Sequence, residues 1–122
     1  MIRASALLLA LALPAGAAPP ERVVSINLCT DQLAMLVAAP GQLVSVSWLA
    51  RDPALSAMPE EARALPANHG LAEDILRLRP DLVLAGAWSD PTTLAMLERL
   101  GLRVETFGAD ADMAGIRADL LR

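Results

Sequence analysis

Short apolar runs alternate with amphipathic segments along most of the chain. Four runs rich in valine, isoleucine and leucine have the length and composition of strands that are buried on both faces. These runs are residues 22–27, 43–47, 81–85 and 103–107. Strands that alternate with helices in this way form right-handed crossover units and a parallel sheet. The pattern therefore predicts an α/β fold, with a Rossmann-like parallel sheet flanked by helices.

Capping and helix-terminating residues indicate where helices begin and end. Asp90 before Pro91 predicts a helix start, because aspartate caps the first turn and proline fits the first helical position. Gly101 predicts the left-handed end of the same helix. Thr30 is the expected cap of an earlier helix. The helices besides the one after Asp90 are expected over residues 30–39, 60–65 and 71–78, and from residue 110 or 112 onward.

One edge of the predicted sheet is the expected ligand site. In parallel sheets, ligands meet the loops beyond the carboxyl ends of the strands. Here these loops begin at Asn27, Trp48, Trp88 and Gly108. The sequence therefore predicts that these positions line a shared cleft.

Composition and charge exclude several classes of function. The 122 residues are 55% apolar and 20% charged, which is typical of a globular domain. The formal net charge is −4 and all ten positive residues are arginine, so no basic nucleic-acid-binding surface is expected. A single cysteine excludes an intramolecular disulfide, and a single histidine excludes a multi-histidine zinc site within this chain. We therefore expect no resident metal site.

Residues 1–17 have the three parts of a secretory signal peptide. Arg3 supplies the positive charge, residues 6–13 form an apolar stretch and residues 15–17 are small. The apolar stretch is too short for a membrane-spanning helix, which needs roughly 20 residues. We expect cleavage near Ala17 and export of the remaining chain without a membrane anchor. A helix buried within the domain is the alternative interpretation.

The sequence contains no recognisable catalytic motif. Cys29 has no histidine or asparagine partner at a known spacing, and we expect it to be a small buried thiol. Neither a nucleophile-elbow motif nor a phosphate-binding glycine loop occurs. We therefore expect no catalytic residues, and a protein that is not an enzyme.

Residues 70–84, with the sequence GLAEDILRLRPDLVL, resemble a signature of periplasmic substrate-binding proteins. These proteins serve ABC transporters for ferric siderophores, heme and cobalamin. The strands, the proline-rich loop, the signature and the segment 100–104 follow one another in the order usual for that family. The resemblance therefore extends over residues 21–122.

The resemblance implies a protein of two lobes that are joined by a long rigid helix and hold the ligand between them. This sequence would be the N-terminal lobe, residues 18–122, ending where the joining helix begins. The second lobe would then belong to a longer gene product, or the protein is truncated. The resemblance also implies that the protein captures a metal chelate in the periplasm and delivers it to the permease. The bound chelate is cargo, and no cofactor is expected.

Glu73 is the residue that the resemblance assigns to docking. In the family, an exposed glutamate on each lobe pairs with arginines of the permease, and Glu73 occupies the matching position in the signature. An exposed carboxylate stays solvated and attracts a partner of opposite charge. The alternative is an acid that only stabilises the helix N-terminus, and Asp74 is the weaker candidate for docking.

Trp48 and Trp88 are candidate ligand contacts because both follow predicted strands. An indole at these positions offers a large flat surface for a corrin, a porphyrin or a catecholate. Packing within the core or a loop is the alternative for each of them.

Three polar residues complete the expected ligand-binding set. Arg51 lies in the loop after Trp48, where its guanidinium suits a carboxylate, although an ion pair with Asp52 is the alternative. His69 precedes the signature and is a candidate ligand for heme iron or cobalt, with ordinary hydrogen bonding as the alternative. Asn27 faces the expected cleft from the first strand-to-helix turn.

A second class of function remains open from the residues alone. The chain has the pattern of a fragment of a secreted α/β hydrolase or oxidoreductase whose catalytic residues lie beyond residue 122. The signature at 70–84 favours the binding protein over this alternative. A receptor for bare zinc or manganese is disfavoured, because this lobe lacks the ligands.

Overall fold

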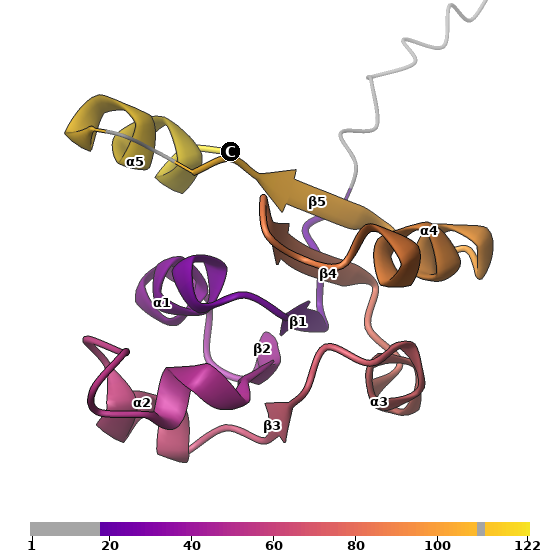
Figure 1. The fold of residues 1–122 in the computed structure, drawn as a ribbon, viewed down its shortest axis with the longest axis horizontal. Coiled ribbons are helices and arrows are strands. Elements are labelled where there is room, and N and C mark those ends of the chain that lie inside the picture. Colours follow the sequence, from indigo (N-terminus) through magenta and orange to yellow (C-terminus); the bar gives the residue numbers. More distant parts are fainter. Residues whose placement is uncertain (1–17, 110–111) are drawn as a thin grey trace, which may run out of the picture.

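The computed structural model describes residues 18–109 and 112–122, which form a parallel sheet with helices on both faces (Figure 1). The strands are β1 (Val23–Ser25), β2 (Leu43–Ser47), β3 (Ala67–Asn68), β4 (Leu82–Gly86) and β5 (Val104–Phe107). Their order across the sheet is β3-β2-β1-β4-β5, and each neighbouring pair runs parallel. The predicted α/β fold with a parallel sheet is therefore confirmed.

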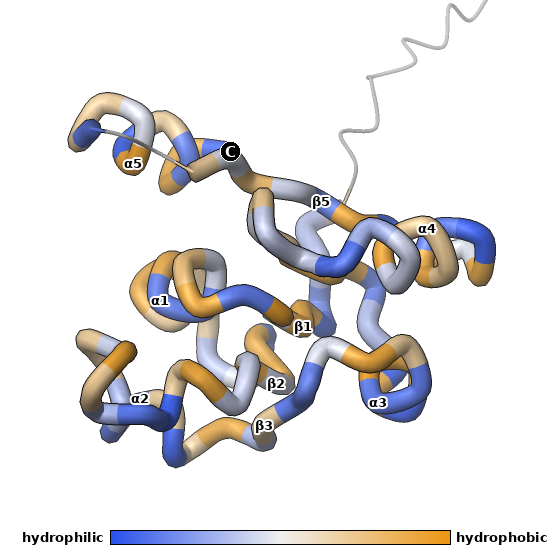
Figure 2. Tube along the Cα trace, in the orientation of Figure 1, coloured by the Kyte–Doolittle hydropathy of each residue, from blue (hydrophilic) through white to orange (hydrophobic). Residues whose placement is uncertain are grey.

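The helices are divided between the two faces of the sheet. They are α1 (Leu28–Val37), the short 3-10 helix η1 (Trp48–Arg51), α2 (Pro59–Arg63), α3 (Ala72–Leu78), α4 (Pro91–Arg99) and α5 (Met113–Leu120). Helices α1 and α2 lie on one side of the sheet, and α3 and α4 lie on the other (Figure 1). Hydrophobic positions alternate with hydrophilic ones along the helices (Figure 2), as expected for helices that pack one side on a sheet.

Two apolar clusters fill the space between the sheet and its helices. Val23 of β1 joins the cluster beneath α1 and α2, whereas its neighbour Val24 joins the cluster beneath α3 and α4. Successive side chains of a strand point to opposite faces, so one strand serves both clusters. The buried residues of the first cluster are Val23, Ala34, Leu43, Val46, Ala50, Ala62 and Leu82. Those of the second are Val24, Ile75, Val83 and Leu97.

Several predicted helix ends are confirmed. The Asp90 side chain accepts a hydrogen bond from the Thr93 backbone N–H at 2.9 Å and caps α4. Gly101 follows α4 with φ of 84°, in the left-handed region. Asp112 caps α5 by accepting from the Gly115 N–H at 2.9 Å. The predicted signal peptide over residues 1–17 and the alternative helix start at residue 110 lie outside the described residues.

One strand and one helix cap differ from the predictions. The strand β3 was not predicted, because it has two residues and no apolar run; it pairs with the end of β2. The prediction of Thr30 as a helix cap is wrong, since α1 begins at Leu28 and Asn27 is its cap. Thr30 instead lies buried, and its hydroxyl donates to the Asn27 carbonyl at 3.0 Å.

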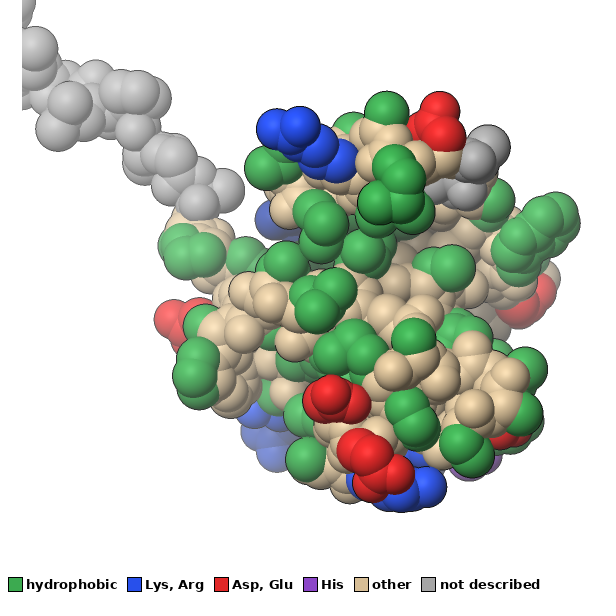
Figure 3. Space-filling model, turned by 90° about the vertical axis from the view of Figure 1, so that its left-hand side faces the viewer, with side chains coloured by type: hydrophobic (Ala, Val, Ile, Leu, Met, Phe, Trp, Pro, Cys, Tyr) green, Lys and Arg blue, Asp and Glu red, His purple; other side chains and the backbone are tan. Residues whose placement is uncertain are grey.

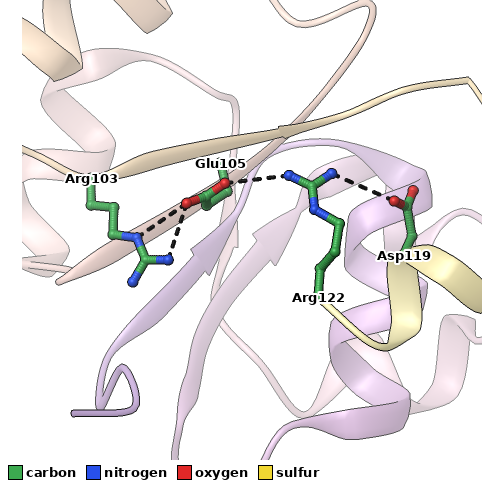
Figure 4. Close-up of polar contacts among 4 residues, drawn as sticks. All are labelled: Arg103, Glu105, Asp119 and Arg122. Atoms are coloured by element: carbon green, nitrogen blue, oxygen red, sulfur yellow. Dashed lines mark hydrogen bonds and ion pairs between the residues drawn. The ribbon is translucent and has the colours of Figure 1, made fainter. Parts of the chain in front are cut away.

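The sheet face beside α1 remains open over β4 and β5. A groove of about 470 Å³ lies between α1 and α5 and is lined by Leu84 and neighbouring apolar side chains. Hydrophobic side chains are exposed on this side of the molecule (Figure 3). Four charged groups lie along the groove, where Glu105 pairs with Arg103 at 3.0 Å and with Arg122 at 3.4 Å (Figure 4). Arg122 also pairs with Asp119 at 3.6 Å.

Within the described part of the chain, no helix combines the length and the apolar character that crossing a membrane requires.

Candidate ligand-binding site

The carboxyl ends of the strands lie together at one edge of the sheet, because all the strands run parallel. At this edge β1 and β4 are neighbours, and the helices that follow them, α1 and α4, cover opposite faces. Two loops that diverge from neighbouring strands leave a crevice between them, which is where doubly wound sheets bind their ligands. The candidate site is therefore built from the loops that follow β1, β2, β3 and β4.

Asn27 lies at the point where the loops after β1 and β4 diverge. Its side chain contacts the backbone of Gly86, so closely that a Cβ atom at position 86 would lie 2.4 Å from Asn27 Cγ. Asn27 Oδ1 also accepts from the Cys29 N–H at 3.0 Å, which caps α1. The half-buried Asn27 thus has two structural roles, and its predicted contact with a ligand remains a prediction.

Trp48 and His69 form a stacked pair of rings at the candidate site. Trp48 follows β2 and His69 follows β3, and the ring centroids lie 6.2 Å apart with an interplanar angle of 24°. Trp48 remains 49% exposed and His69 is exposed as well. The neighbouring strands β2 and β3 therefore present one mixed aromatic surface to the solvent.

Trp88 is the most exposed of the predicted ligand residues, with 86% of its surface accessible. It lies in the turn after β4, which two hydrogen bonds hold closed. The Ser89 N–H donates to the Gly86 carbonyl at 3.0 Å, and the Gly86 N–H donates to the Ser89 hydroxyl at 3.1 Å. Because its indole is so exposed, the alternative that Trp88 packs within the core is not the arrangement observed.

Arg51 has structural partners that the sequence did not predict. Its guanidinium donates to the Ala62 carbonyl in the last turn of α2 at 3.4 Å, and to the carbonyl of Leu65, just beyond that helix. Asp52 instead accepts from the Ala54 N–H at 2.8 Å, so the alternative of an Arg51–Asp52 ion pair is not the arrangement observed. Arg51 attaches the end of α2 to η1, and its predicted contact with a ligand remains a prediction.

Glu73 lies in the first turn of α3, and its side chain is 76% exposed. Arg77 lies 3.9 Å from the Glu73 carboxylate but closer to Asp74, at 3.1 Å. An exposed ion pair of this kind contributes little to stability and is easily exchanged for another partner. The Glu73 carboxylate is therefore accessible to a partner, and its role in docking remains a prediction.

The prediction that Cys29 is a buried thiol is wrong, because Cys29 is exposed in the first turn of α1. The helix begins two residues earlier than predicted, so Cys29 is a first-turn residue at the ligand edge. Within residues 18–109 and 112–122, no three histidine, cysteine, aspartate or glutamate side chains converge on a position that could hold a metal ion.

A buried polar network beneath the site was missed by the sequence analysis. Asp31 is fully buried and accepts hydrogen bonds from the Ser47 N–H at 3.1 Å and from the Ser47 hydroxyl. Burial raises the pKa of the Asp31 carboxyl, although hydrogen bonds from the Ser25 and Ser47 side chains act in the opposite direction. The signal in the sequence is the presence of serines inside apolar strands, since buried hydroxyls need partners.

Asn68 extends this network to a third strand. Its amide nitrogen donates to the Ser25 carbonyl at 2.9 Å, the Ser45 hydroxyl at 2.9 Å and the Val46 carbonyl at 3.0 Å. Its amide oxygen accepts from the Gly70 N–H at 3.0 Å. Asn68 therefore joins β1, β2 and the loop that carries His69.

No family model matches the sequence, and no curated protein matches it either. Solved structures do match. A periplasmic heme-binding protein from Pseudomonas aeruginosa is 26% identical with a TM-score of 0.69, and the match covers 83% of this chain and 36% of that chain. The periplasmic heme-binding protein BhuT, solved with two hemes, is 32% identical with a TM-score of 0.59, over 80% of this chain and 37% of that one.

A third match concerns a different cargo. The periplasmic vitamin B12-binding protein BtuF of Vibrio cholerae is 35% identical with a TM-score of 0.57, over 73% of this chain and 34% of that chain. This chain thus spans about a third of the length of the three solved proteins. All three are binding proteins rather than enzymes. The chain therefore has the fold of one lobe of these periplasmic binding proteins, and the matches support its assignment as the N-terminal lobe of a periplasmic substrate-binding protein.

Proposed function

We propose that this chain is the part of a substrate-binding protein that captures a flat metal tetrapyrrole, such as heme or cobalamin. The observation that supports this most is the pair of exposed aromatic surfaces at the carboxyl edge: the Trp48–His69 stack on one side and Trp88 on the other. Aromatic faces bind planar ligands over a large area at a small cost in side-chain entropy. The heme- and vitamin B12-binding proteins among the matches favour the same class of cargo.

Capture by such a site requires no chemical step. The indole of Trp88 would stack on the macrocycle, and the exposed imidazole of His69, with Trp48 packed against its ring, would be available to coordinate the iron or cobalt through a ring nitrogen. The described residues contain no metal site of their own, so the metal would arrive with the cargo. Because a single lobe covers one side of a ligand, we expect affinity in the micromolar range or weaker for this chain alone.

The wider setting is an ABC importer. The proposal includes export through a signal peptide at residues 1–17, residence in the periplasm and delivery of the cargo to the permease. Glu73 would contact the permease from the first turn of α3, where its exposed carboxylate suits an arginine of the partner. The alternative of a secreted hydrolase or oxidoreductase fragment has less support, because the matched proteins named above are binding proteins.

Absorption spectroscopy with hemin tests the proposed cargo. We expect the chain to bind at least one of the two ligands: hemin, detected as a shift of its Soret band, or cyanocobalamin, detected in a separate titration. His69→Gln should remove the part of the shift that arises from coordination. Cys29→Ser is the matched control, because Cys29 is another exposed potential ligand at this edge. A hemin spectrum unchanged by the chain, together with no binding of cyanocobalamin, would contradict the proposal.

A further inference from the structure

Two buried polar side chains form hydrogen bonds with residues that flank Trp48 and His69 in the chain. Asp31 comes from α1 and Asn68 from β3, and at most 2% of either residue is exposed. Burying polar groups costs free energy unless their hydrogen bonds are made, and apolar residues would fill such positions at lower cost. The described buried side chains have no unpaired nitrogen or oxygen, so this network is fully satisfied. A satisfied buried network of this kind favours one particular arrangement of the chain around it.

Asp31 forms hydrogen bonds with Ser47, the residue that precedes Trp48. Both the N–H and the hydroxyl of Ser47 donate to its carboxyl group, so the last residue of β2 is attached to α1 at two points. The chain enters η1 at the next residue, which is Trp48. The direction in which the indole leaves β2 therefore depends on the Asp31 contact.

Asn68 fixes the chain on both sides of His69. It precedes the histidine in the chain, and its amide oxygen accepts from the N–H of Gly70, the residue after the histidine. Its amide nitrogen is held by acceptors on β1 and β2. Gly70 has φ of 71°, a left-handed conformation that this hydrogen bond helps to fix. The position of the imidazole relative to β2 therefore depends on Asn68.

We propose that Asp31 and Asn68 are positioning residues, which lock the ends of β1, β2 and β3 so that Trp48 and His69 remain stacked as one ligand-facing surface. The stacking part of this proposal stands without a ligand, and the ligand-facing part rests on the proposed function. Because the two parts have different measurements, the failure of one is distinguishable from the failure of the other.

The stack is measured without any ligand. In a Trp88→Phe background, Trp48 is the only tryptophan, and its near-ultraviolet circular dichroism reports how rigidly the indole is held. We expect Asp31→Leu and Asn68→Leu each to lose most of this band. Asp31→Asn should retain it, because an amide preserves an acceptor for the Ser47 N–H.

Thr30→Val is the matched control for a loss of stability alone. Thr30 is buried in the same network, but its hydrogen bonds go to Ser25 and to the Asn27 carbonyl and do not reach β2 or β3. This variant should unfold more easily and keep the Trp48 band. If Asp31→Leu does not fold, Ser47→Ala replaces it, since it removes one partner of the carboxyl group. A band that stays unchanged in Asn68→Leu and in the Asp31→Leu or Ser47→Ala variant would overturn the proposal.

The ligand-facing part is measured with hemin in the otherwise native chain. We expect Asn68→Leu to weaken hemin binding by about tenfold, the factor that corresponds to about 1.4 kcal/mol of lost pre-organisation. Thr30→Val should bind hemin as the native chain does. Loss of the Trp48 band with hemin binding unchanged would overturn the ligand-facing part. If the native chain binds neither hemin nor cyanocobalamin, the proposed function is contradicted, and the stacking result is then judged by itself.

Discussion

Asp31 carries the buried carboxyl group of the polar network, and its ionisation is coupled to stability. Burial raises its pKa in the folded chain above the value of 3.8 that an unburied aspartate has. The folded state therefore holds this proton more tightly than the unfolded state does. The resulting stabilisation is fully present below the unfolded pKa and is lost as the pH rises through the raised folded pKa.

A comparison with Asp31→Asn isolates this effect. The amide does not titrate, so the unfolding free energy of the native chain should fall relative to that of the variant as the pH rises from about 4 toward neutrality. Urea unfolding at a series of pH values measures the difference. A difference that stays constant, or that changes in the opposite direction, would show that the carboxyl is not held in an environment that disfavours its charge.

Gly86 is required by the close approach of Asn27. A methyl group at position 86 would overlap the Asn27 side chain, which also caps α1. We expect Gly86→Ala to destabilise the chain by about 1 kcal/mol or more, since the loss of a helix cap alone costs about that much. Gly108→Ala is the matched control, because no atom lies within 4 Å of its added Cβ and its φ is not left-handed. Equal unfolding midpoints for the two variants would contradict the inferred contact.

At the scale of elements, α4 is attached to the sheet mainly through one face. Leu97 is fully buried between α4 and the sheet, whereas Leu100, which caps the end of this helix, is 54% exposed. We expect Leu97→Ala to lower the unfolding free energy by about 2–4 kcal/mol, as other large-to-small core substitutions do. Leu100→Ala should change it by no more than about 0.5 kcal/mol. Chemical denaturation measures both, and similar losses in the two variants would contradict this packing.

The elements that sequence reasoning predicted well are those with strong local signals. The strand at Leu43–Ser47 and the helix that begins after Asp90 combine an apolar pattern with turn and capping residues, and both are observed. β3 has no such signal, because its two residues become a strand only by pairing with the end of β2. Similarly, Thr30 was predicted as the cap of α1 and Asn27 is the cap observed, because both residue types cap helices well and local sequence does not rank them.

The same limit applies to the candidate site. Trp48, His69 and Trp88 were expected there because they follow or precede predicted elements at the ligand edge, and each is exposed at that edge. The stacking of Trp48 on His69 depends on the pairing of β2 with the unpredicted β3. The network of Asp31 and Asn68 likewise joins residues that are distant in the sequence. Only the fold brings these residues together.

At the scale of the whole molecule, the proposed docking role of Glu73 is tested by reversing its charge. In a complete binding protein that carries this lobe, Glu73→Arg should slow uptake by the cognate permease in proteoliposomes without changing ligand affinity. Repulsion from arginines of the permease is the physical reason.

Glu60→Arg provides a matched control for that experiment. Glu60 is also a first-turn acid, its side chain is 74% exposed, and it pairs with Arg63 as Glu73 pairs with Arg77. Uptake should be normal in this variant. Normal uptake in Glu73→Arg as well would remove the docking assignment.

The most direct test of the central claim uses the two tryptophans of the chain as separate reporters. Trp88→Phe leaves only Trp48, and Trp48→Phe leaves only Trp88. Each variant is titrated with hemin and with cyanocobalamin while its fluorescence is recorded, and free N-acetyltryptophanamide corrects for absorption by the ligand. We predict that at least one of the two ligands quenches both indoles in a saturable manner, with half-saturation at about micromolar concentration or above. If neither indole shows saturable quenching with either ligand, the carboxyl edge of this sheet does not bind a tetrapyrrole.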